Sequence, residues 1–370
     1  MRRKILFFFL AIIFMVMAAP VQGQSQDCSQ KYLTTEKPIL PFGDWSDGAF
    51  NRRIIFPWYA VGPTADGGSW ETRIVFGYAA VPPPANFKGG WYTVQFKTTA
   101  EMPSWATGLS FNVRFASTPG SEWLWGGLPG GNFFSIGEKI ELHFRKASWW
   151  DGRSEQNHPI EWVNTGIVIV DFWAGVNSDP CIVNRLFDNY AYGQLTFLSR
   201  RPDGTVEWQV SEPGYFTDQL SARWAAPINV SGDLSAQPPD FTDFEDSSFA
   251  IANAGDSEIR VRISLFEQFG EPHEGFSYPS WQKTIVLGPL RTEGHIIRQF
   301  FGDALFRGIY PGSNYGGRPS GFRGTILFEA IDASGNIVPD AKIVPLVIQR
   351  VGDSLTNVQL VKLPPVKPTW

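Results

Sequence analysis

Four tryptophans in glycine-rich surroundings are the residues whose type and setting best fit a chemical task. Trp123 and Trp125 stand in a Gly- and Pro-rich segment, and Trp149 and Trp150 directly precede Asp151-Gly152. We predict that both pairs lie in loops. Exposed aromatic rings stack against sugar rings or proline-rich chains and are frequent anchors of protein interfaces. The alternative, which we favour, is that these rings fold back as lids over the ends of a β-sandwich.

Carboxylate pairs are the second group to test, because glycosidases use two carboxyl groups on either side of the bond they cleave. Two sets are available: Glu138 with Glu141, and Asp243 with Glu245 and Asp246. The first set begins an alternating strand, where a solvated face explains it. The second set falls in an expected linker, and it lacks the regular ligand spacing of a calcium-binding EF-hand loop. A glycoside hydrolase or lyase is therefore an alternative and not the leading hypothesis.

Histidines and nucleophile motifs give no stronger signal for catalysis. The four histidines, His143, His158, His273 and His295, are not at metal-ligand spacing from one another or from a cysteine. The chain has no Gly-x-Ser-x-Gly nucleophile elbow, and its glycine-dense segment 126–131 lacks the Lys-Ser/Thr of a phosphate-binding loop. We therefore predict no metal, no cofactor and no enzymatic activity.

The N-terminus predicts export. Arg2-Arg3-Lys4 precedes fifteen apolar residues, Ile5 to Ala19, and small residues follow, with Val21 and Gly23 at the −3 and −1 positions of the best cleavage site. This is the pattern of a secretory signal peptide over residues 1–23. The alternative is a membrane anchor, but a spanning helix needs about 20 apolar residues. We expect a secreted protein, periplasmic or extracellular.

Charge and hydropathy restrict the partners of the exported chain. Removal of residues 1–23 takes away three basic residues and changes the formal net charge from −5 to −8. An acidic chain without a basic run argues against nucleic acid as a partner. No later segment is long and apolar enough to span a bilayer, so we predict no transmembrane segment after signal removal.

The two cysteines, Cys28 and Cys181, are an even count in an oxidising compartment and favour one disulfide. The alternative is two free, buried thiols. The bond would join the N-terminal arm to the later part of the first domain.

Composition and periodicity predict an all-β protein. Aromatic residues make up 15% of the chain, and the 37 Gly and 28 Pro fit short strands joined by tight turns. Residues 70–76, 109–115 and 259–265 alternate between apolar and polar side chains, as half-buried strands do. One short helix is expected between Gly294 and Phe306, where apolar residues recur at helical period.

The mature chain of 347 residues (370 minus 23) is long enough for two domains. We predict two antiparallel immunoglobulin-like β-sandwiches. The expected segments are an N-terminal arm over 24–50, a first domain over 51–225 with an aromatic insertion at 117–160, a linker over 226–246, a second domain over 247–363, and a proline-rich tail over 364–370.

Two sets of residues resemble a group of uncharacterised secreted bacterial proteins. The first is Phe56-Pro57, followed by Ala65-Asp66-Gly67-Gly68-Ser69-Trp70-Glu71-Thr72, and the second is Gly321-Phe322-Arg323-Gly324-Thr325. The resemblance touches most of residues 54–363, although the loop at 82–90 and the insertion at 117–160 depart from it. It implies a secreted tandem of immunoglobulin-like modules and brings no established activity.

These observations lead to a functional expectation. We expect a non-enzymatic extracytoplasmic or cell-surface module for adhesion, envelope contact or protein binding. The runner-up is a carbohydrate-binding protein that uses Trp123, Trp125, Trp149 and Trp150 as stacking platforms. The expected partner is a protein or a glycan of the cell envelope.

Overall fold

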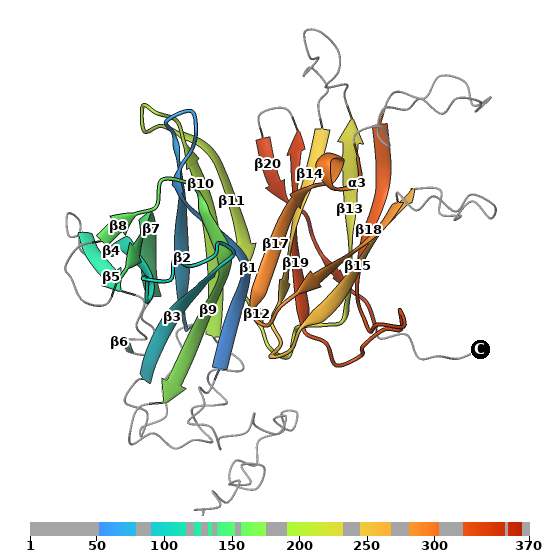
Figure 1. The fold of residues 1–370 in the computed structure, drawn as a ribbon, viewed down its shortest axis with the longest axis horizontal. Helices are drawn as coiled ribbons and strands as arrows, with labels where there is room; N and C mark the ends of the chain where they lie inside the picture. The colour runs from blue at the N-terminus through green and yellow to red at the C-terminus, as the bar shows by residue number, and fades with distance from the viewer. Residues whose placement is uncertain are drawn as a thin grey trace, which may run out of the picture.

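The protein is all β, as predicted, and is shown here as a computed structural model (Figure 1). Its one described helix is α3 (Ile297–Phe301). The structure describes residues 52–78, 90–115, 122–126, 132–134, 139–151, 157–174, 191–231, 245–267, 281–302, 321–351 and 354–364. The expected signal peptide, the N-terminal arm, Cys28 and Cys181 lie outside these ranges.

The first domain consists of two antiparallel sheets that face each other. One sheet contains, in order, β12 (Tyr215–Phe216), β1 (Arg52–Pro63), β9 (Asn164–Ala174), β3 (Gly90–Thr98) and β6 (Asn132–Phe134). The other contains β5 (Glu122–Gly126), β4 (Gly108–Phe115), β7 (Lys139–Trp150), β2 (Ser69–Tyr78), β10 (Ala191–Arg200) and β11 (Val206–Pro213), with β8 (Asn157–Pro159) beside β7.

Alternating side chains build the core between these two sheets. Ile74 and Phe76 of β2 are fully buried, as are Leu142 and Phe144 of β7. Phe96 of β3 crosses from the opposite sheet, and its ring centroid lies 4.6 Å from that of Phe144. Burial of each large apolar side chain contributes about 1.5–3 kcal/mol. The pattern that predicted the strands therefore also supplies the stability of the sandwich.

The second domain is a smaller sandwich of the same kind. Its first sheet contains β16 (Gln282–Leu287), β15 (Ile259–Glu267), β18 (Gly321–Ile331) and β13 (Arg223–Ser231), with β21 (Val361–Lys362) beside β13. Its second sheet contains β17 (Arg291–Ile296), β14 (Glu245–Asn253), β19 (Ile343–Val351) and β20 (Ser354–Asn357). The two sheets meet where Ser231 pairs with Glu245.

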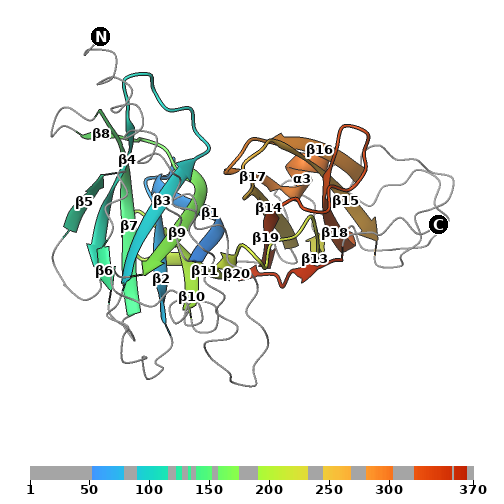
Figure 2. The same ribbon diagram turned by 90° about the horizontal axis from the view of Figure 1, so that it is seen from below.

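The two domains pack side by side through the faces of two sheets (Figures 1 and 2). Ile55 and Ile167 of the first domain form a buried cluster with Ala252 and Val344 of the second. The Trp58 indole lies so close to Gly294 that an added Cβ would approach it to 2.7 Å. An apolar contact of this kind favours one orientation of the two domains.

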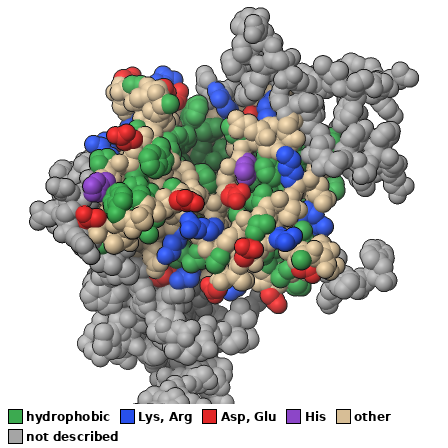
Figure 3. Space-filling model, viewed as in Figure 1, with side chains coloured by type: hydrophobic (Ala, Val, Ile, Leu, Met, Phe, Trp, Pro, Cys, Tyr) green, Lys and Arg blue, Asp and Glu red, His purple; other side chains and the backbone are tan. Residues whose placement is uncertain are grey.

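Polar contacts add to this interface at its edges. The Arg350 guanidinium stacks over the Trp208 ring at 5.2 Å, and Asn357 Nδ2 donates to the Ser211 carbonyl over 3.1 Å. Arg291 donates to the carbonyl of Thr98. Figure 3 shows a hollow between the domains with hydrophobic side chains in it.

Each domain places a buried carboxylate on a central strand between cross-strand arginines. In the first domain Glu71 of β2 lies 2.8 Å from Arg200 Nε and 3.1 Å from Arg145 Nε. In the second domain, the Glu329 carboxylate of β18 lies 3.0 Å from Arg223 Nε and 2.6 Å from Arg262 Nη2. Paired charges and hydrogen bonds offset the cost of burying a carboxylate. These acidic residues therefore belong to the scaffold.

Tight turns form where Gly and Pro predicted them. At the β10–β11 hairpin, Gly204 N–H donates to the Arg201 carbonyl over 2.8 Å, and Gly204 has a φ of +83°. At the β1–β2 hairpin, Gly67 has a φ of +86°. Both conformations favour glycine because it has no Cβ.

The structure differs from the sequence expectations at three places. Residues 226–231, expected in a linker, belong to β13, in which Trp224, Ala226, Ile228 and Val230 face the core of the second domain. Proline is tolerated in a strand where its nitrogen, which has no hydrogen to donate, faces no hydrogen-bonding partner on a neighbouring strand. Pro227 is exposed and meets this condition, because β14 and β21 pair with β13 only near the ends of β13.

The other two differences concern the helix and the aromatic insertion. Residues 291–296 are strand β17, so the helix begins only at Ile297, because pairing with β14 competes with the helical pattern. Within the insertion expected at 117–160, the strand expected near Ile140 is confirmed as part of β7, but the four tryptophans expected in loops lie in strands β5 and β7. Aromatic residues favour strands, and this preference prevails over the neighbouring glycines.

Candidate functional site: an aromatic loop surface on the first domain

The four predicted tryptophans occupy different environments. Trp123 and Trp125 lie in β5, where their backbones pair with Val113 and Phe111 of β4. Their side chains are not among those that the structure describes. Trp149 is only 3% exposed and packs in the core of the first domain. Trp149 therefore presents no ring face to a ligand in this structure. Trp150, the last residue of β7, is partly exposed.

Two loops beside Trp150 carry exposed aromatic residues that the sequence analysis did not select. Residues 99–107 join β3 to β4, and residues 157–163 comprise β8 and the connection to β9. Trp105 is 47% exposed and Trp162 is 52% exposed, with Met102 at 50%. We call these two segments the aromatic loop surface. Figure 2 shows the long loop rising at the end of the domain where β8 lies.

Hydrogen bonds to the sandwich fix the first of these loops. The Thr107 N–H donates to the Trp150 carbonyl over 2.7 Å, and its Oγ1 donates to the same oxygen over 3.1 Å. The Ala106 N–H bonds the Pro103 carbonyl over 2.9 Å, and Ala106 itself is buried. Trp105 therefore lies in a turn, and the two residues that follow it, Ala106 and Thr107, are held in place by hydrogen bonds.

The second loop is fixed in the same manner and is tied to the first. Ile160 is buried and its N–H donates to the Ala147 carbonyl of β7 over 3.0 Å. The Thr99 N–H donates to the Thr165 carbonyl over 2.8 Å, and the two hydroxyls lie 2.9 Å apart. Thr165 belongs to β9, directly after the second loop, and the Trp105 ring contacts the His158 ring of the second loop, so the two loops meet.

Each exposed indole has about half of its surface free. The Trp105 ring contacts the His158 ring with 4.5 Å between centroids and an interplanar angle of 61°, so His158 supports it from one side. A large ring that is held on one side and free on the other is a preorganised contact surface, because little side-chain entropy remains to be lost on binding. Figure 3 shows hydrophobic side chains gathered over this side of the first domain.

Apart from His158, the exposed polar side chains of the aromatic loop surface are acidic or hydroxylic. Glu101, Ser104, Thr107 and Glu161 are exposed, as is His158. The sequence of 99–107 and 157–163 contains no Lys or Arg. Such a surface suits a partner without negative charge.

The sequence does contain a signal that would have found this surface. Trp105 follows Met102-Pro103-Ser104 and precedes Ala106-Thr107-Gly108, and Trp162 follows Pro159-Ile160-Glu161. A single tryptophan in a short run of turn-forming residues has no strand face into which it can turn. In composition alone, the denser tryptophan pairs at 123–125 and 149–150 give a stronger signal than these isolated residues.

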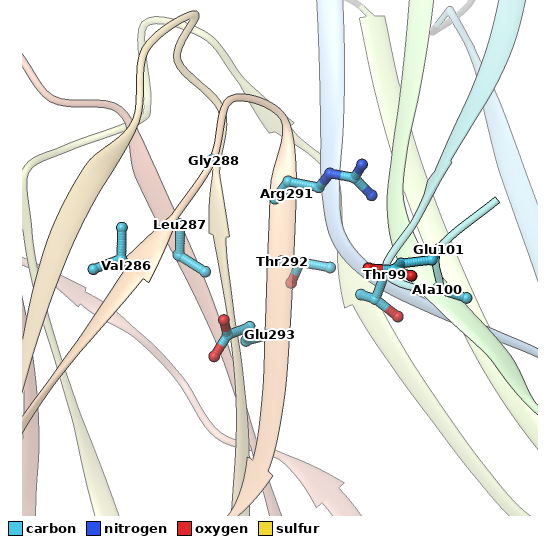
Figure 4. A pocket seen from close by; sticks show the side chains of 9 residues that line it. All are labelled: Thr99, Ala100, Glu101, Val286, Leu287, Gly288, Arg291, Thr292 and Glu293. Carbon is cyan, nitrogen blue, oxygen red and sulfur yellow. The ribbon is translucent and has the colours of Figure 1, made fainter.

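A second candidate is a hollow of about 320 Å³ between the domains (Figure 4). The loop at 99–101 forms one wall, and residues 286–288 and 291–293 form the other. Glu101 and Glu293 line it from opposite domains, and Glu293 lies 3.2 Å from His295 Nε2. Arg291 extends across it toward the loop in Figure 4. The hollow adjoins the aromatic loop surface at Glu101.

The carboxylate sets considered for hydrolysis or calcium binding are not assembled into a site in the described chain. Glu141 is paired with Arg73 at 2.6 Å and with Lys139 at 3.1 Å. Asp246 lies 3.6 Å from Arg298 Nε. Glu138 and Asp243 lie outside the described residues. Within those ranges, no group of three or more His, Cys, Asp or Glu is placed to hold a metal ion.

One buried carboxylate, Glu212 of β11, lacks the arginine partners that Glu71 and Glu329 have. It is 1% exposed, and neither of its oxygens makes a hydrogen bond of normal geometry to a described residue. Burial raises the pKa of Glu212 well above its usual value, and the nearby backbone amide of Trp58 only partly opposes this. Glu212 is therefore protonated at a pH at which ordinary glutamates are charged.

Comparisons with known proteins find no match for this chain. No protein-family model matches the chain, and no curated protein or solved structure does either. The resemblance to secreted tandem immunoglobulin-like proteins stays a prediction. None of the described helices is long and apolar enough to cross a membrane.

Proposed function

We propose that this is an exported, non-enzymatic binding protein that contacts a component of the cell envelope or its surroundings through the aromatic loop surface. The observation that carries this proposal is the exposure of Trp105 and Trp162 on loops that are hydrogen-bonded to a rigid sandwich. Tryptophan is enriched among the residues that anchor contact sites.

The environment of the buried charged groups also favours binding over catalysis. Glu71, Glu329 and Asp171 are each engaged by arginines on neighbouring strands, which leaves them no acid–base role toward a substrate. The aromatic loop surface, in contrast, offers ring faces, hydroxyls and exposed carboxylates. These groups can hold a partner without changing it chemically.

The packing of the two domains supports an adhesive role. Because Ile55 and Ile167 are buried against Ala252 and Val344, the second domain holds the first in one orientation. The N-terminal signal pattern is consistent with action outside the cytoplasm, in the periplasm or beyond it.

The proposal is tested by retention of residues 24–370 on isolated cell envelopes and on insoluble polysaccharides. The test variant combines Trp105→Ala and Trp162→Ala. Phe266→Ala is the matched control, because Phe266 is an exposed aromatic residue, 40% accessible, on the second domain. We expect the wild type and the control to be retained and the double variant to be washed off. Equal retention of all three proteins would refute the proposed surface.

A further inference from the structure

We infer that the ligand of the aromatic loop surface is an uncharged polysaccharide; this inference rests on the proposed function and specifies the chemistry of its ligand. Pyranose rings have an apolar C–H face and a rim of hydroxyls. The aromatic loop surface offers the counterpart of both, with half-exposed indoles beside carboxylate and hydroxyl oxygens.

Charge gives the first argument for an uncharged ligand. The segments 99–107 and 157–163 contain Glu101 and Glu161 and no Lys or Arg, and removal of the predicted signal peptide leaves a formal charge of −8. A phosphate-, sulfate- or carboxylate-bearing polymer would meet repulsion here, since like charges raise the cost of association. Carboxylates accept hydrogen bonds from sugar hydroxyls without this penalty.

The support beneath the rings gives the second argument. Trp105 is held from one side by His158 at 4.5 Å, and the loop behind it is bonded to Trp150 through Thr107. Stacking on a flat ring face requires that the face stays open and stationary. Protein interface anchors differ, because they are inserted into a pocket of the partner and need a protruding side chain.

The placement of two indoles on two connected loops gives the third argument. Trp105 and Trp162 lie on segments that meet where the Trp105 ring contacts the His158 ring, with 4.5 Å between the centroids. A chain of several sugar rings offers more than one ring to such a surface, and a second contact then follows at high effective concentration. A polymer therefore suits this surface better than a single sugar.

The experiment is native gel electrophoresis of residues 24–370 in gels containing one soluble polysaccharide each. The uncharged set consists of hydroxyethylcellulose, mixed-linkage β-glucan, arabinoxylan, galactomannan and dextran, and the anionic set of polygalacturonate and heparin. We expect retardation by at least one uncharged polymer, weakened at least tenfold by Trp105→Ala or Trp162→Ala. Phe266→Ala should be retarded like the wild type, and Trp105→Phe should retain part of the affinity because it keeps a ring face.

Three results would overturn the inference: no retardation by any uncharged polymer, stronger retardation by the anionic polymers, or retardation that the tryptophan variants leave unchanged. The proposed function fails separately, when the double variant binds envelopes as the wild type does. If envelope binding depends on the tryptophans but is abolished by protease treatment of the envelopes, the binding role stands and the polysaccharide is wrong.

Discussion

The interior of the first domain and its aromatic loop surface contain the same type of residue in opposite situations. Trp149 is buried to 3% exposure in the core, whereas Trp105 and Trp162 keep about half of their surface in water. The Trp150 carbonyl, one residue from Trp149, holds the loop of Trp105. The fold explains the first tryptophan, because a core needs large apolar side chains. The fold does not explain why exposed positions 105 and 162 carry tryptophan, and this difference points to function.

Carboxylates show a related contrast. Glu71 and Glu329 are buried between arginines, and Glu212 is buried without them. Although burial raises the pKa of Glu71, contacts with His143, Arg200 and Arg145 lower it to about 2; His143 Nε2 lies 2.9 Å away but is not aligned for a normal hydrogen bond. Burial is thus accommodated by ion pairing in one case and by protonation in the other.

The largest effect is expected in the interior. Trp149→Ala should lower the free energy of unfolding by about 3–5 kcal/mol, because it leaves a large cavity in a close-packed core. Urea denaturation followed by circular dichroism measures this change. Trp149→Phe is the second variant in case the alanine form does not fold, and it should lose clearly less. A loss below about 1 kcal/mol for the alanine form would show that Trp149 is not part of the core.

The next effect is expected at the second domain's buried carboxylate. Glu329→Ala leaves Arg223 and Arg262 without their counter-ion, which should cost about 2–4 kcal/mol; the value is below that of a fully buried pair because the arginines are 16% and 26% exposed. Glu258→Ala, on an exposed residue of the same domain, is the control and should change little. Equal denaturation midpoints for the two variants would contradict the scaffold role of Glu329.

A smaller effect of opposite sign is expected at Glu212. Since its folded pKa is raised, the protonated group supports folding fully below the ordinary glutamate pKa near 4.5, and this support is lost as pH rises toward the raised value. Glu212→Gln, which cannot ionise, should therefore stabilise the protein by about 1–3 kcal/mol at pH 8 and hardly at all at pH 4.

Denaturation midpoints across pH 4–9 test this expectation, with Glu207→Gln as the control on the exposed part of the same strand. The wild-type midpoint should fall with rising pH more steeply than that of Glu212→Gln. Parallel curves for these two proteins would mean that Glu212 is charged and solvated in the native state.

The contrast between interior and surface also explains how much could be read from the sequence. Strict alternation at 70–76 and 259–265 predicted β2 and β15 and also which face of each strand is buried. Successive side chains of a strand point to opposite faces of the sheet, so the apolar positions mark the buried face. The same alternation is present in β13 at 223–231, although the polar residues at 238–240 and 243–248 led us to predict a linker from residue 226 onward. Local composition prevailed over a periodicity that was already visible.

The sequence did not predict which tryptophan side chains are exposed. Trp149 and Trp150 were predicted in a loop because Asp151-Gly152 follows them, yet β7 extends to Trp150 and turns only one of the two inward. Which tryptophan is buried depends on the register of β7 against β4 and β8, and register is fixed by contacts between segments far apart in the chain. The support of Trp105 by His158 is a long-range contact of the same kind.

The smallest effect on stability is expected at the aromatic loop surface itself. Trp105→Ala and Trp162→Ala should each change the free energy of unfolding by less than about 1 kcal/mol, since each removes a half-exposed ring and leaves no closed cavity. Urea denaturation of both variants beside Trp149→Ala provides the direct comparison. If either surface variant were as unstable as Trp149→Ala, its ring would be a structural part of the sandwich, and any loss of envelope binding would reflect unfolding. If both stay as stable as the wild type while binding is lost, the fold does not require these indoles and the contact with the partner does.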